Sequence, residues 1–185
     1  SAFNSIRDTV RNLLDLNRPG MEDKRPCNIN EVIEKTVSLV SSYMKQSRVK
    51  VELDLNPRLP VILASPQQLG QVFLNLINNA FESIMGLSHP LEGEAPSKQG
   101  GLIVIRTTSD SARIMVEFKD SGPGIRPDDI GRIFDPFFTR KKRMGMGVGL
   151  SICLGIIEDH KGTIEAANDP DGGAVFKVTL PITAV

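Results

Sequence analysis

The sequence predicts an α+β domain built as a two-layer sandwich, in which helices cover one face of a mixed, mostly antiparallel sheet. Three observations lead to this fold class. Segments with a helical period alternate with segments that have the two-residue period of strands. Two pairs of expected strands are separated by short turns that are typical of hairpins. A length of 185 residues suits one compact domain with a short appendage.

The first part of the chain, residues 1–18, is expected to be an amphipathic helix. Its apolar residues recur at helical spacing with charged residues between them, and they are Phe3, Ile6, Val10, Leu13 and Leu14. Such a helix packs either on a partner helix or on its own domain, and the first is the preferred interpretation. Residues 19–27 are polar, contain two prolines and are interpreted as a linker to the main domain, residues 28–185.

Two helices of the main domain have recognisable start signals. Asn28 and Glu31 form a capping-box pattern. Ser65 can cap the next long helix, Pro66 fits its first position, and Gln68 completes the box. The expected elements are a helix at 28–44, a strand at 49–55, an apolar run at 61–63, a helix at 65–85, a loop at 86–101, a hairpin at 102–119, a loop at 121–147, a helix at 148–159 and a hairpin at 163–180.

The composition excludes several functional classes. The chain has 22 basic and 22 acidic residues, so it lacks the basic excess that nucleic-acid or acidic-membrane binding usually needs. Its two cysteines, Cys27 and Cys153, do not have the spacing of a zinc site. No apolar run reaches the roughly 18 residues of a membrane span, and no signal peptide is recognised. We therefore expect a cytoplasmic piece of a larger protein, whose parent could be membrane-tethered.

A stripe of amides follows one side of the helix expected at 65–85. Asn75, Asn78 and Asn79 fall within a sector of about 100° that also holds Gln71 and Glu82. Asparagine is a poor helix former, so this stripe calls for a reason. An amide oxygen is a neutral ligand suited to a Mg²⁺ ion that also touches phosphate. The alternative is a solvated polar face.

An acidic residue followed by glycines ends the first hairpin. Asp120 comes before Gly122 and Gly124, whose lack of side chains allows a sharp turn and a close approach to a flat ring. An ionised carboxylate accepts hydrogen bonds, which the amino group of adenine donates and guanine does not donate at that place. A plain Asp-Gly turn is the alternative.

A second glycine-rich segment, residues 145–150, leads into the helix expected at 148–159. It resembles neither a Walker A loop nor a dinucleotide-binding fingerprint. Backbone N–H groups at a helix start favour phosphate, and the preceding basic run, residues 140–143, could supply counter-charge or simply be solvated. Between the two glycine segments, three of the eight phenylalanines lie within residues 134–138. Aromatic residues in such a loop suggest a lid that docks reversibly, or a fixed hydrophobic anchor.

These four segments, in their order and spacing, resemble the sequence boxes of sensor histidine kinases. Residues 75–80 resemble the N box, 120–124 the G1 box, 134–139 the F box and 145–150 the G2 box. The stretches DPFFTRK and GVGLSIC are most similar to the nitrogen-regulation and oxygen-sensing branch. The opening helix resembles the end of the second helix of the family's dimerisation domain.

The resemblance implies an ATP-binding catalytic domain that transfers the γ-phosphoryl group to a histidine. That histidine would lie on a dimerisation domain absent from this chain, in a protein that forms a homodimer at full length and passes the phosphoryl group to a response regulator. ATP and Mg²⁺ are the implied cofactors, and Asn75, Asn79 and Lys141 the implied catalytic residues, with Asn79 as the Mg²⁺ ligand. The implied nucleotide-binding residues are Asn75, Asn79, Glu82, Asp120, Gly122, Gly124, Phe134, Thr139, Arg140, Lys141, Gly145, Gly147, Val148, Gly149, Leu150 and Thr163. Glu82 departs from the basic residue that many relatives have there.

The histidine that receives the phosphoryl group is not recognised in the chain. The histidines present are His89, in the Gly- and Pro-rich loop, and His160, at a helix end where a cation suits the helix dipole. An ATP-driven conformational ATPase of the same superfamily is one alternative, but those relatives have a glutamate base where this chain has Asn75, and an amide cannot take a proton from water. A serine-directed kinase of the anti-sigma type is the other alternative.

Overall fold

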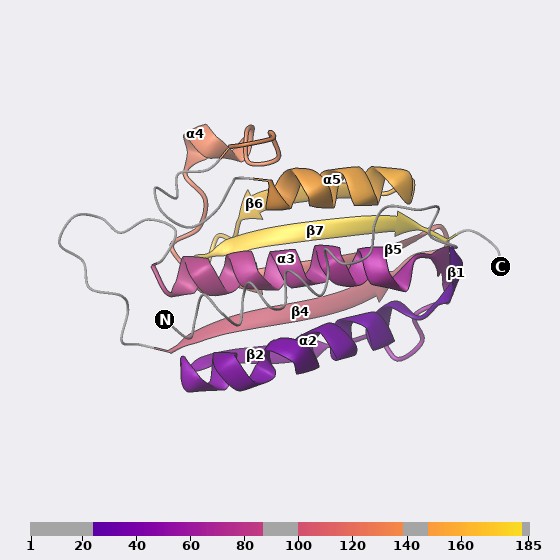
Figure 1. The fold of residues 1–185 in the computed structure, drawn as a ribbon, viewed down its shortest axis with the longest axis horizontal. Coiled ribbons are helices and arrows are strands. Elements are labelled where there is room, and N and C mark those ends of the chain that lie inside the picture. The colour runs from indigo at the N-terminus through magenta and orange to yellow at the C-terminus, as the bar shows by residue number, and fades with distance from the viewer. Residues whose placement is uncertain (1–23, 87–99, 139–147, 183–185) are drawn as a thin grey trace.

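The computed structural model describes residues 24–86, 100–138 and 148–182. Within them, three helices form one layer against a five-stranded sheet (Figure 1). The helices are α2 (Ile29–Gln46), α3 (Pro66–Ile84) and α5 (Gly149–Asp159), and α3 lies between the other two. This arrangement confirms the expected α+β sandwich. The helix expected at 1–18 lies outside the described residues.

The sheet is mixed, as expected. Its strand order is β2-β4-β5-β7-β6, with β2 and β4 parallel and the other neighbours antiparallel. The strands are β2 (Val49–Asp54), β4 (Gly101–Ser109), β5 (Arg113–Asp120), β6 (Thr163–Asn168) and β7 (Ala174–Pro181). Most of these bounds differ from the expected ones by a single residue.

The core lies between the sheet and the helix layer. Every second residue of β5 is buried from Ile114 onward, and Phe118 meets Phe73 of α3 with ring centroids 5.6 Å apart. Asp120 continues this buried series as the last residue of β5. Because side chains alternate between the two faces of a strand, Asp120 faces the helix layer with the apolar residues before it.

The side chains of both predicted N-caps accept a backbone hydrogen bond, whereas the Ser65 N–H, which a capping box would join to Gln68, donates to His160 Nε2. The Ser65 hydroxyl accepts a hydrogen bond from the Gln68 N–H at 3.3 Å, and Pro66 occupies the first turn of α3. The Asn28 side chain accepts from the Asn30 N–H at 3.0 Å, which closes the start of α2. None of the helices in the described ranges is both long enough and apolar enough to cross a membrane.

Two elements differ from the expectation. Residues 25–27, expected to belong to the linker, form the strand β1 (Arg25–Cys27), which pairs antiparallel with β3 (Ile62–Ala64). Cys27 is buried there, so the folded domain begins earlier than predicted. A strand of three residues is too short to show a two-residue period in the sequence. The short helix α4 (Pro127–Ile130) lies in the segment expected to be a loop.

Candidate functional site

Asp120 presents a buried carboxylate at the end of β5. Its side chain is 2% exposed, and its Oδ1 accepts from the N–H of Gly122 at 2.7 Å and from that of Ala174 at 3.4 Å. Burial raises the pKa of this carboxyl, and the two backbone hydrogen bonds oppose that rise. No described residue donates to the other oxygen, Oδ2. The structure therefore provides a fixed acceptor with one oxygen left for a donor.

The loop after Asp120 lies tightly against the C-terminal end of α3. A Cβ on Gly122 would be 2.4 Å from Ser83 Oγ and 3.2 Å from the backbone nitrogen of Ile84. Gly124 has φ +80°, which favours glycine. Both glycines predicted to shape this loop are thus required by its geometry.

Asn75 joins α3 to the start of α5. Its Nδ2 is 3.5 Å from the carbonyl oxygen of Gly149 and 3.6 Å from Sγ of Cys153. Burial raises the pKa of Cys153 to about 12, so this sulfur is a neutral thiol. The structure therefore brings Asn75 together with Gly149. Val148 and Leu150, the chain neighbours of Gly149, lie next to this contact.

The start of α5 differs from the starts of α2 and α3 in its capping. Asn28 and Ser65 cap α2 and α3, whereas α5 has no side-chain cap in the described part of the chain. The N–H groups of a first helical turn lack partners within the helix, and the helix dipole makes this end positive. An anion can bind to such an end.

The amide stripe on α3 has more than one role. Asn78 accepts a hydrogen bond from the Tyr43 hydroxyl of α2 at 2.7 Å. Burial, and to a lesser extent the charge of Glu82, raises the pKa of Tyr43, which keeps this donor protonated. Asn79 is half-buried and forms no hydrogen bond through its side chain to another described residue. Asn78 therefore ties two helices together, Glu82 lies close enough to Tyr43 to act on it, and Asn79 keeps its amide for another partner.

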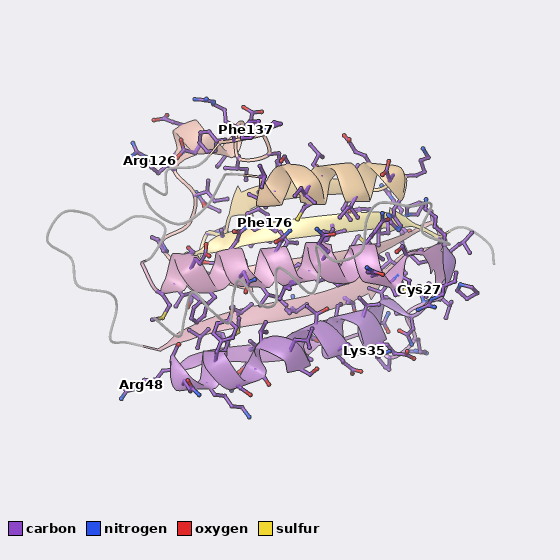
Figure 2. All side chains as sticks on the ribbon, in the orientation of Figure 1. Cys27, Lys35, Arg48, Arg126, Phe137 and Phe176 are labelled. Atoms are coloured by element: carbon purple, nitrogen blue, oxygen red, sulfur yellow. The ribbon has the colours of Figure 1, made fainter. Side chains whose placement is uncertain are left out.

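The aromatic segment is anchored at one residue and exposed at another. Phe134 meets Phe176 of β7 edge to face, with centroids 6.4 Å apart, and Arg132 lies 5.0 Å from the centroid of Phe138. Phe137 is 75% exposed with φ +64° (Figure 2). Phe134 thus fits the anchor alternative. The other lid residues predicted to contact the nucleotide, together with two glycines of the phosphate segment, lie outside the described residues: Thr139, Arg140, Lys141, Gly145 and Gly147.

Thr163 is not brought to this site. It is exposed at the first position of β6 and pairs with Thr179, which in turn faces Met115 on β5. Met115 precedes Asp120 by five residues, so Thr163 lies about 17 Å from Asp120 along the strand direction. Thr163, which the resemblance implied to bind the nucleotide, therefore lies away from Asp120 in this structure. The resemblance was the ground for the role of Thr163, whereas the β7 residue that reaches Asp120 is Ala174.

His160 has a structural place. It is 6% exposed, its Nε2 accepts from the Ser65 N–H at 3.0 Å, and its Nδ1 lies 2.8 Å from the carbonyl oxygen of Ile156. Since Nε2 is an acceptor, the proton is on Nδ1 and the ring is neutral. The suggestion of a cation at this helix end is therefore wrong, and a ring engaged on both nitrogens is poorly placed to receive a phosphoryl group. His89 lies outside the described residues.

Three residues around Asp120 were missed by the sequence analysis: Ser83, Asn168 and Gly173. Asn168 bonds the loop after Asp120 through both ends of its amide. A Cβ on Gly173 would lie 1.7 Å from the Asp120 carbonyl oxygen. The hairpin expected at 163–180 contains Gly173, but the contact of this glycine with Asp120 depends on the sheet register.

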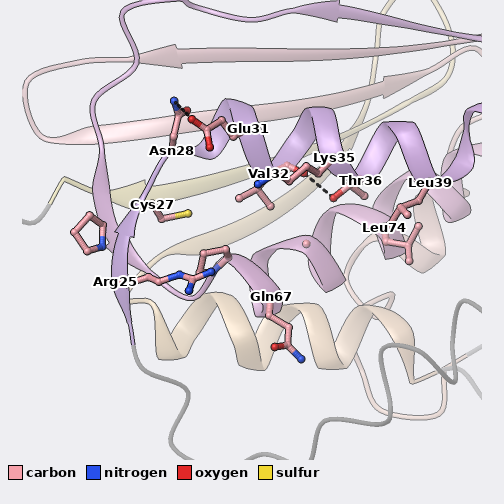
Figure 3. A pocket seen from close by; sticks show the side chains of 13 residues that line it. Arg25, Cys27, Asn28, Glu31, Val32, Lys35, Thr36, Leu39, Gln67 and Leu74 are labelled. Carbon is pink, nitrogen blue, oxygen red and sulfur yellow. Dashed lines mark hydrogen bonds between the residues drawn. The ribbon is translucent and has the colours of Figure 1, made fainter.

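A cavity of about 290 Å³ lies away from these residues, between β1, α2 and the first half of α3 (Figure 3). Its wall includes Cys27, Leu39 and Leu74. Burial raises the pKa of the Cys27 thiol, so this cysteine is a poor nucleophile. The cavity contains neither Asp120 nor the start of α5, and we assign it no part in the site.

Comparison with known proteins identifies the relatives of this arrangement. The family described as histidine kinase-, DNA gyrase B-, and HSP90-like ATPase matches residues 64–184. The sensor histidine kinase ZraS of Salmonella typhi is 34% identical over 179 residues, covering 97% of this chain and 36% of ZraS. The sensor protein FixL of Bradyrhizobium diazoefficiens is 36% identical over 172 residues, covering 93% of this chain and 32% of FixL. The chain thus spans about a third of the length of these relatives.

Solved structures show the same fold. The nucleotide-free catalytic domain of the histidine kinase ThkA superposes with a TM-score of 0.74 at 29% identity, covering 87% of this chain and 97% of that one. ThkA has also been solved in complex with the response regulator protein TrrA, and that kinase superposes with a TM-score of 0.73 at 26% identity over 98% of this chain and 48% of its own.

Proposed function

Because the chain belongs to the histidine kinase-, DNA gyrase B- and HSP90-like ATPase family, as a catalytic ATP-binding domain of the sensor histidine kinase type, we propose that it transfers the γ-phosphoryl group of Mg²⁺-ATP to a histidine. The acceptor histidine lies on a dimerisation domain, and a response regulator receives the phosphoryl group from it. The observation that carries this proposal is the position of α3 between two binding features. One end of α3 meets the loop after Asp120, and Asn75 meets the start of α5.

The two contacts are separated by the length of a nucleotide. Ser83 and Asn75 are eight residues apart on α3, a distance of about 12 Å along the helix. An extended nucleoside triphosphate has a comparable length from its base to its last phosphate. The base would lie beside Asp120, and the phosphates beside Gly149.

Asp120 is proposed to select adenine. Its Oδ2 can accept from the exocyclic amino group, where guanine offers a carbonyl that repels it. Gly122 and Gly124 leave the base room to approach the backbone, since side chains there would meet Ser83 and Asn168.

The start of α5, which has no side-chain cap among the described residues, is proposed to hold the phosphates through Val148, Gly149 and Leu150. The described residues contain no group of three or more His, Cys, Asp or Glu side chains that could hold a metal ion. In the proposal, Asn79 would hold a Mg²⁺ ion through its amide oxygen, which no described residue engages. Arg140 and Lys141, with Gly145 and Gly147, complete the phosphate site in the proposal. Bound Mg²⁺ neutralises charge on the phosphates, and the chain's own residues position the reactants.

The amide at position 75 favours phosphoryl transfer to an imidazole over hydrolysis. A water molecule needs a base to become a good nucleophile, and Asn75 cannot accept its proton. Its amide instead holds the start of α5 through Gly149. An imidazole supplied by a partner domain is already a nucleophile and needs only to be positioned.

The dimerisation domain is proposed to precede the catalytic domain, with residues 1–18 as the end of its second helix and a linker up to β1. Radiolabelled ATP tests the proposed function directly. This chain alone is expected to bind ATP without labelling itself or releasing phosphate at a useful rate. Adding a separate dimerisation domain is expected to place acid-labile label on that domain. Rapid phosphate release without an acceptor would instead support the ATPase alternative.

A further inference from the structure

We propose that Asn168 is a positioning residue for adenine recognition, and that the hairpin turn from Asn168 to Ala174 holds both parts of the base site. This inference rests on the proposed nucleotide function and goes beyond the four sequence boxes, none of which includes the turn. The two parts of the base site are the loop from Gly122 to Ile125 and the carboxylate of Asp120. The turn contacts each of them through a different group.

Asn168 binds the loop through both ends of its side-chain amide. Oδ1 accepts from the Ile125 N–H at 2.6 Å, and Nδ2 donates to the Ile125 carbonyl oxygen at 2.6 Å. An amide can donate and accept at once, whereas a carboxylate accepts only and an alanine does neither. The pair of bonds therefore holds both peptide groups that flank the Cα of Ile125, and so fixes the distance and the orientation of this residue of the loop.

The glycine before Ile125 is packed on the same side chain. A Cβ on Gly124 would lie 2.7 Å from Asn168 Oδ1 and 3.4 Å from the carbonyl oxygen of Gly173. Gly124 also has φ +80°, so its backbone is already in a conformation that suits glycine. The Asn168 side chain thus packs against the loop at Gly124 and bonds to it at Ile125.

The other end of the turn supports Asp120 itself. The Ala174 N–H donates to Asp120 Oδ1 at 3.4 Å, and Gly173, with φ +88°, packs against the Asp120 carbonyl. Asn168 and Ala174 are partners in the β6–β7 register. The residue that clamps the loop and the residue that supports the carboxylate are therefore paired across one ladder.

The turn is closed by its own hydrogen bonds. The Asp169 N–H donates to the Gly173 carbonyl at 3.0 Å, and the Gly172 N–H donates to the Asp169 carbonyl at 3.0 Å. The Asp169 carboxylate lies 2.8 Å from Nζ of Lys119 on β5 and accepts from the Asp171 N–H at 2.9 Å. These bonds join the turn to the strand that ends at Asp120, so the clamp is part of the sheet.

The readout that tests this inference is base selectivity. Affinities for ATP and GTP are measured by calorimetry for the whole chain and for Asn168→Ala. We expect ATP affinity to fall about tenfold while GTP affinity changes little, because only adenine uses a precisely placed Asp120. The ratio of ATP affinity to GTP affinity is therefore expected to fall together with the ATP affinity. A variant that only unfolds part of the sample lowers both affinities together and leaves the ratio unchanged.

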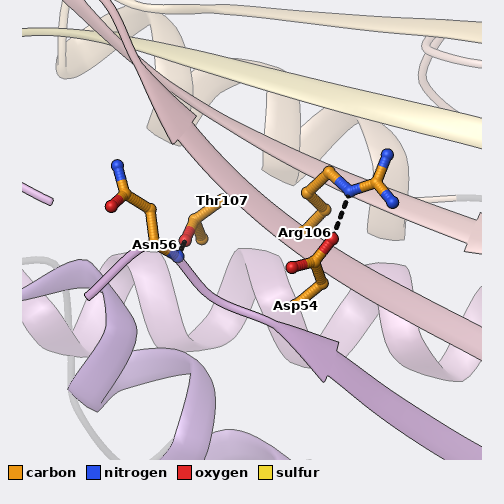
Figure 4. A network of polar contacts seen from close by, with 4 residues as sticks. All are labelled: Asp54, Asn56, Arg106 and Thr107. Carbon is orange, nitrogen blue, oxygen red and sulfur yellow. Dashed lines mark hydrogen bonds and ion pairs between the residues drawn. The ribbon is translucent and has the colours of Figure 1, made fainter. Parts of the chain in front are cut away.

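Asn168→Asp is the conservative variant. It keeps the acceptor for the Ile125 N–H and loses the donor, so its selectivity is expected to lie between those of the wild type and Asn168→Ala. It also supplies the test if Asn168→Ala does not fold. Asn56→Ala is the matched control, because Asn56 also stabilises a turn, with Oδ1 accepting from the Arg58 N–H at 3.0 Å, near Thr107 at the far end of the sheet (Figure 4). Its ATP-to-GTP ratio is expected to equal that of the wild type.

The outcomes separate this inference from the proposed function. If the wild type prefers ATP and Asp120→Asn abolishes that preference, the proposed base site holds. An unchanged ratio in Asn168→Ala, or in Asn168→Asp where the alanine variant does not fold, then overturns the role of Asn168 alone. If the wild type binds both nucleotides equally or neither, the base site itself is wrong and the positioning role falls with it.

Discussion

Nδ2 of Asn75 lies 3.5 Å from the carbonyl oxygen of Gly149, which joins two segments 74 residues apart in the chain. This contact places the middle of α3 against the first residue of α5, whose start has no side-chain cap in the described residues. The amide side of α3 and the end of α5 that is proposed to bind phosphate therefore form one wall.

Replacing Asp120 by asparagine is expected to lower the affinity for ATP without lowering the stability of the domain. The amide oxygen of the new side chain can still accept from the Gly122 and Ala174 N–H groups, but its amino group would face the amino group of adenine. The loss of a charge-assisted hydrogen bond corresponds to about 1.5–3 kcal/mol of binding free energy. The unliganded melting temperature is expected to stay equal or rise, because a buried charge is removed. Calorimetry and thermal unfolding measure the two effects, and unchanged ATP affinity would remove Asp120 from the site.

The pH dependence of ATP binding follows from the raised pKa of Asp120. Only the ionised carboxylate accepts from adenine, so affinity is expected to fall as the pH drops through a value above the ordinary 3.8. The stability of the unliganded domain is expected to change in the opposite direction. Folding favours the protonated form of Asp120, so the contribution of this group becomes more stabilising as the pH falls through the folded pKa towards 3.8. Subtracting the pH profile of Asp120→Asn from that of the wild type isolates both effects. Coincident profiles would contradict the prediction.

The lowered pKa of Asp169 predicts the reverse behaviour at the hairpin turn. The hydrogen bond from Lys119 is the main cause of the lower pKa, followed by the one from the Asp171 N–H. Stability from this group is therefore present above pH 3.8 and is lost as the pH falls through the lower folded value. Asp169→Asn is expected to flatten this part of the stability profile. The measurement is chemical unfolding of the wild type and of Asp169→Asn from about pH 5 to about pH 2, the range in which a paired carboxylate takes up its proton.

Asn79 and Asn78 form a matched pair of substitutions on one helix. Asn79→Ala is expected to abolish Mg²⁺-dependent phosphoryl transfer and leave the melting temperature close to that of the wild type, since its amide has no partner among the described residues. Asn78→Ala is expected to cost about 1 kcal/mol of unfolding free energy, through the lost bond to Tyr43, and to retain Mg²⁺ dependence. If Asn79→Ala unfolds the domain instead, Asn79 is structural and the metal assignment fails.

His160→Ala is expected to destabilise the domain without changing where the phosphoryl group goes. The substitution leaves the buried Ser65 N–H without its acceptor on the ring, at a cost of about 1–3 kcal/mol of unfolding free energy. Transfer to an added dimerisation domain, measured well below the lowered melting temperature, is expected to continue. If the wild-type chain itself becomes labelled by radioactive ATP and the His160→Ala chain does not, His160 is an acceptor.

Much of the site could be predicted from the sequence because its signals are local. The caps at Asn28 and Ser65 depend on hydrogen bonds that span two or three residues. The burial of Asp120 follows from the two-residue period of β5, and the backbone freedom of Gly124 from its residue type. Interactions this short in sequence are encoded by neighbouring residues, which explains why the fold class, the three long helices and the strands of the main sheet were predicted close to their observed bounds.

The partners of particular side chains were decided by the tertiary structure alone. Asn78 and Asn79 are adjacent and identical in type, yet only Asn78 meets Tyr43, 35 residues away on α2. Asn168 reaches Ile125 across 43 residues, and Ala174 reaches Asp120 across 54, because the β5–β7–β6 register aligns them. The same register carries Thr163 to the other end of the sheet. Strand register depends on packing summed over the whole sheet, so no local pattern around Asn168 or Thr163 could have shown which of the two lies beside the base site.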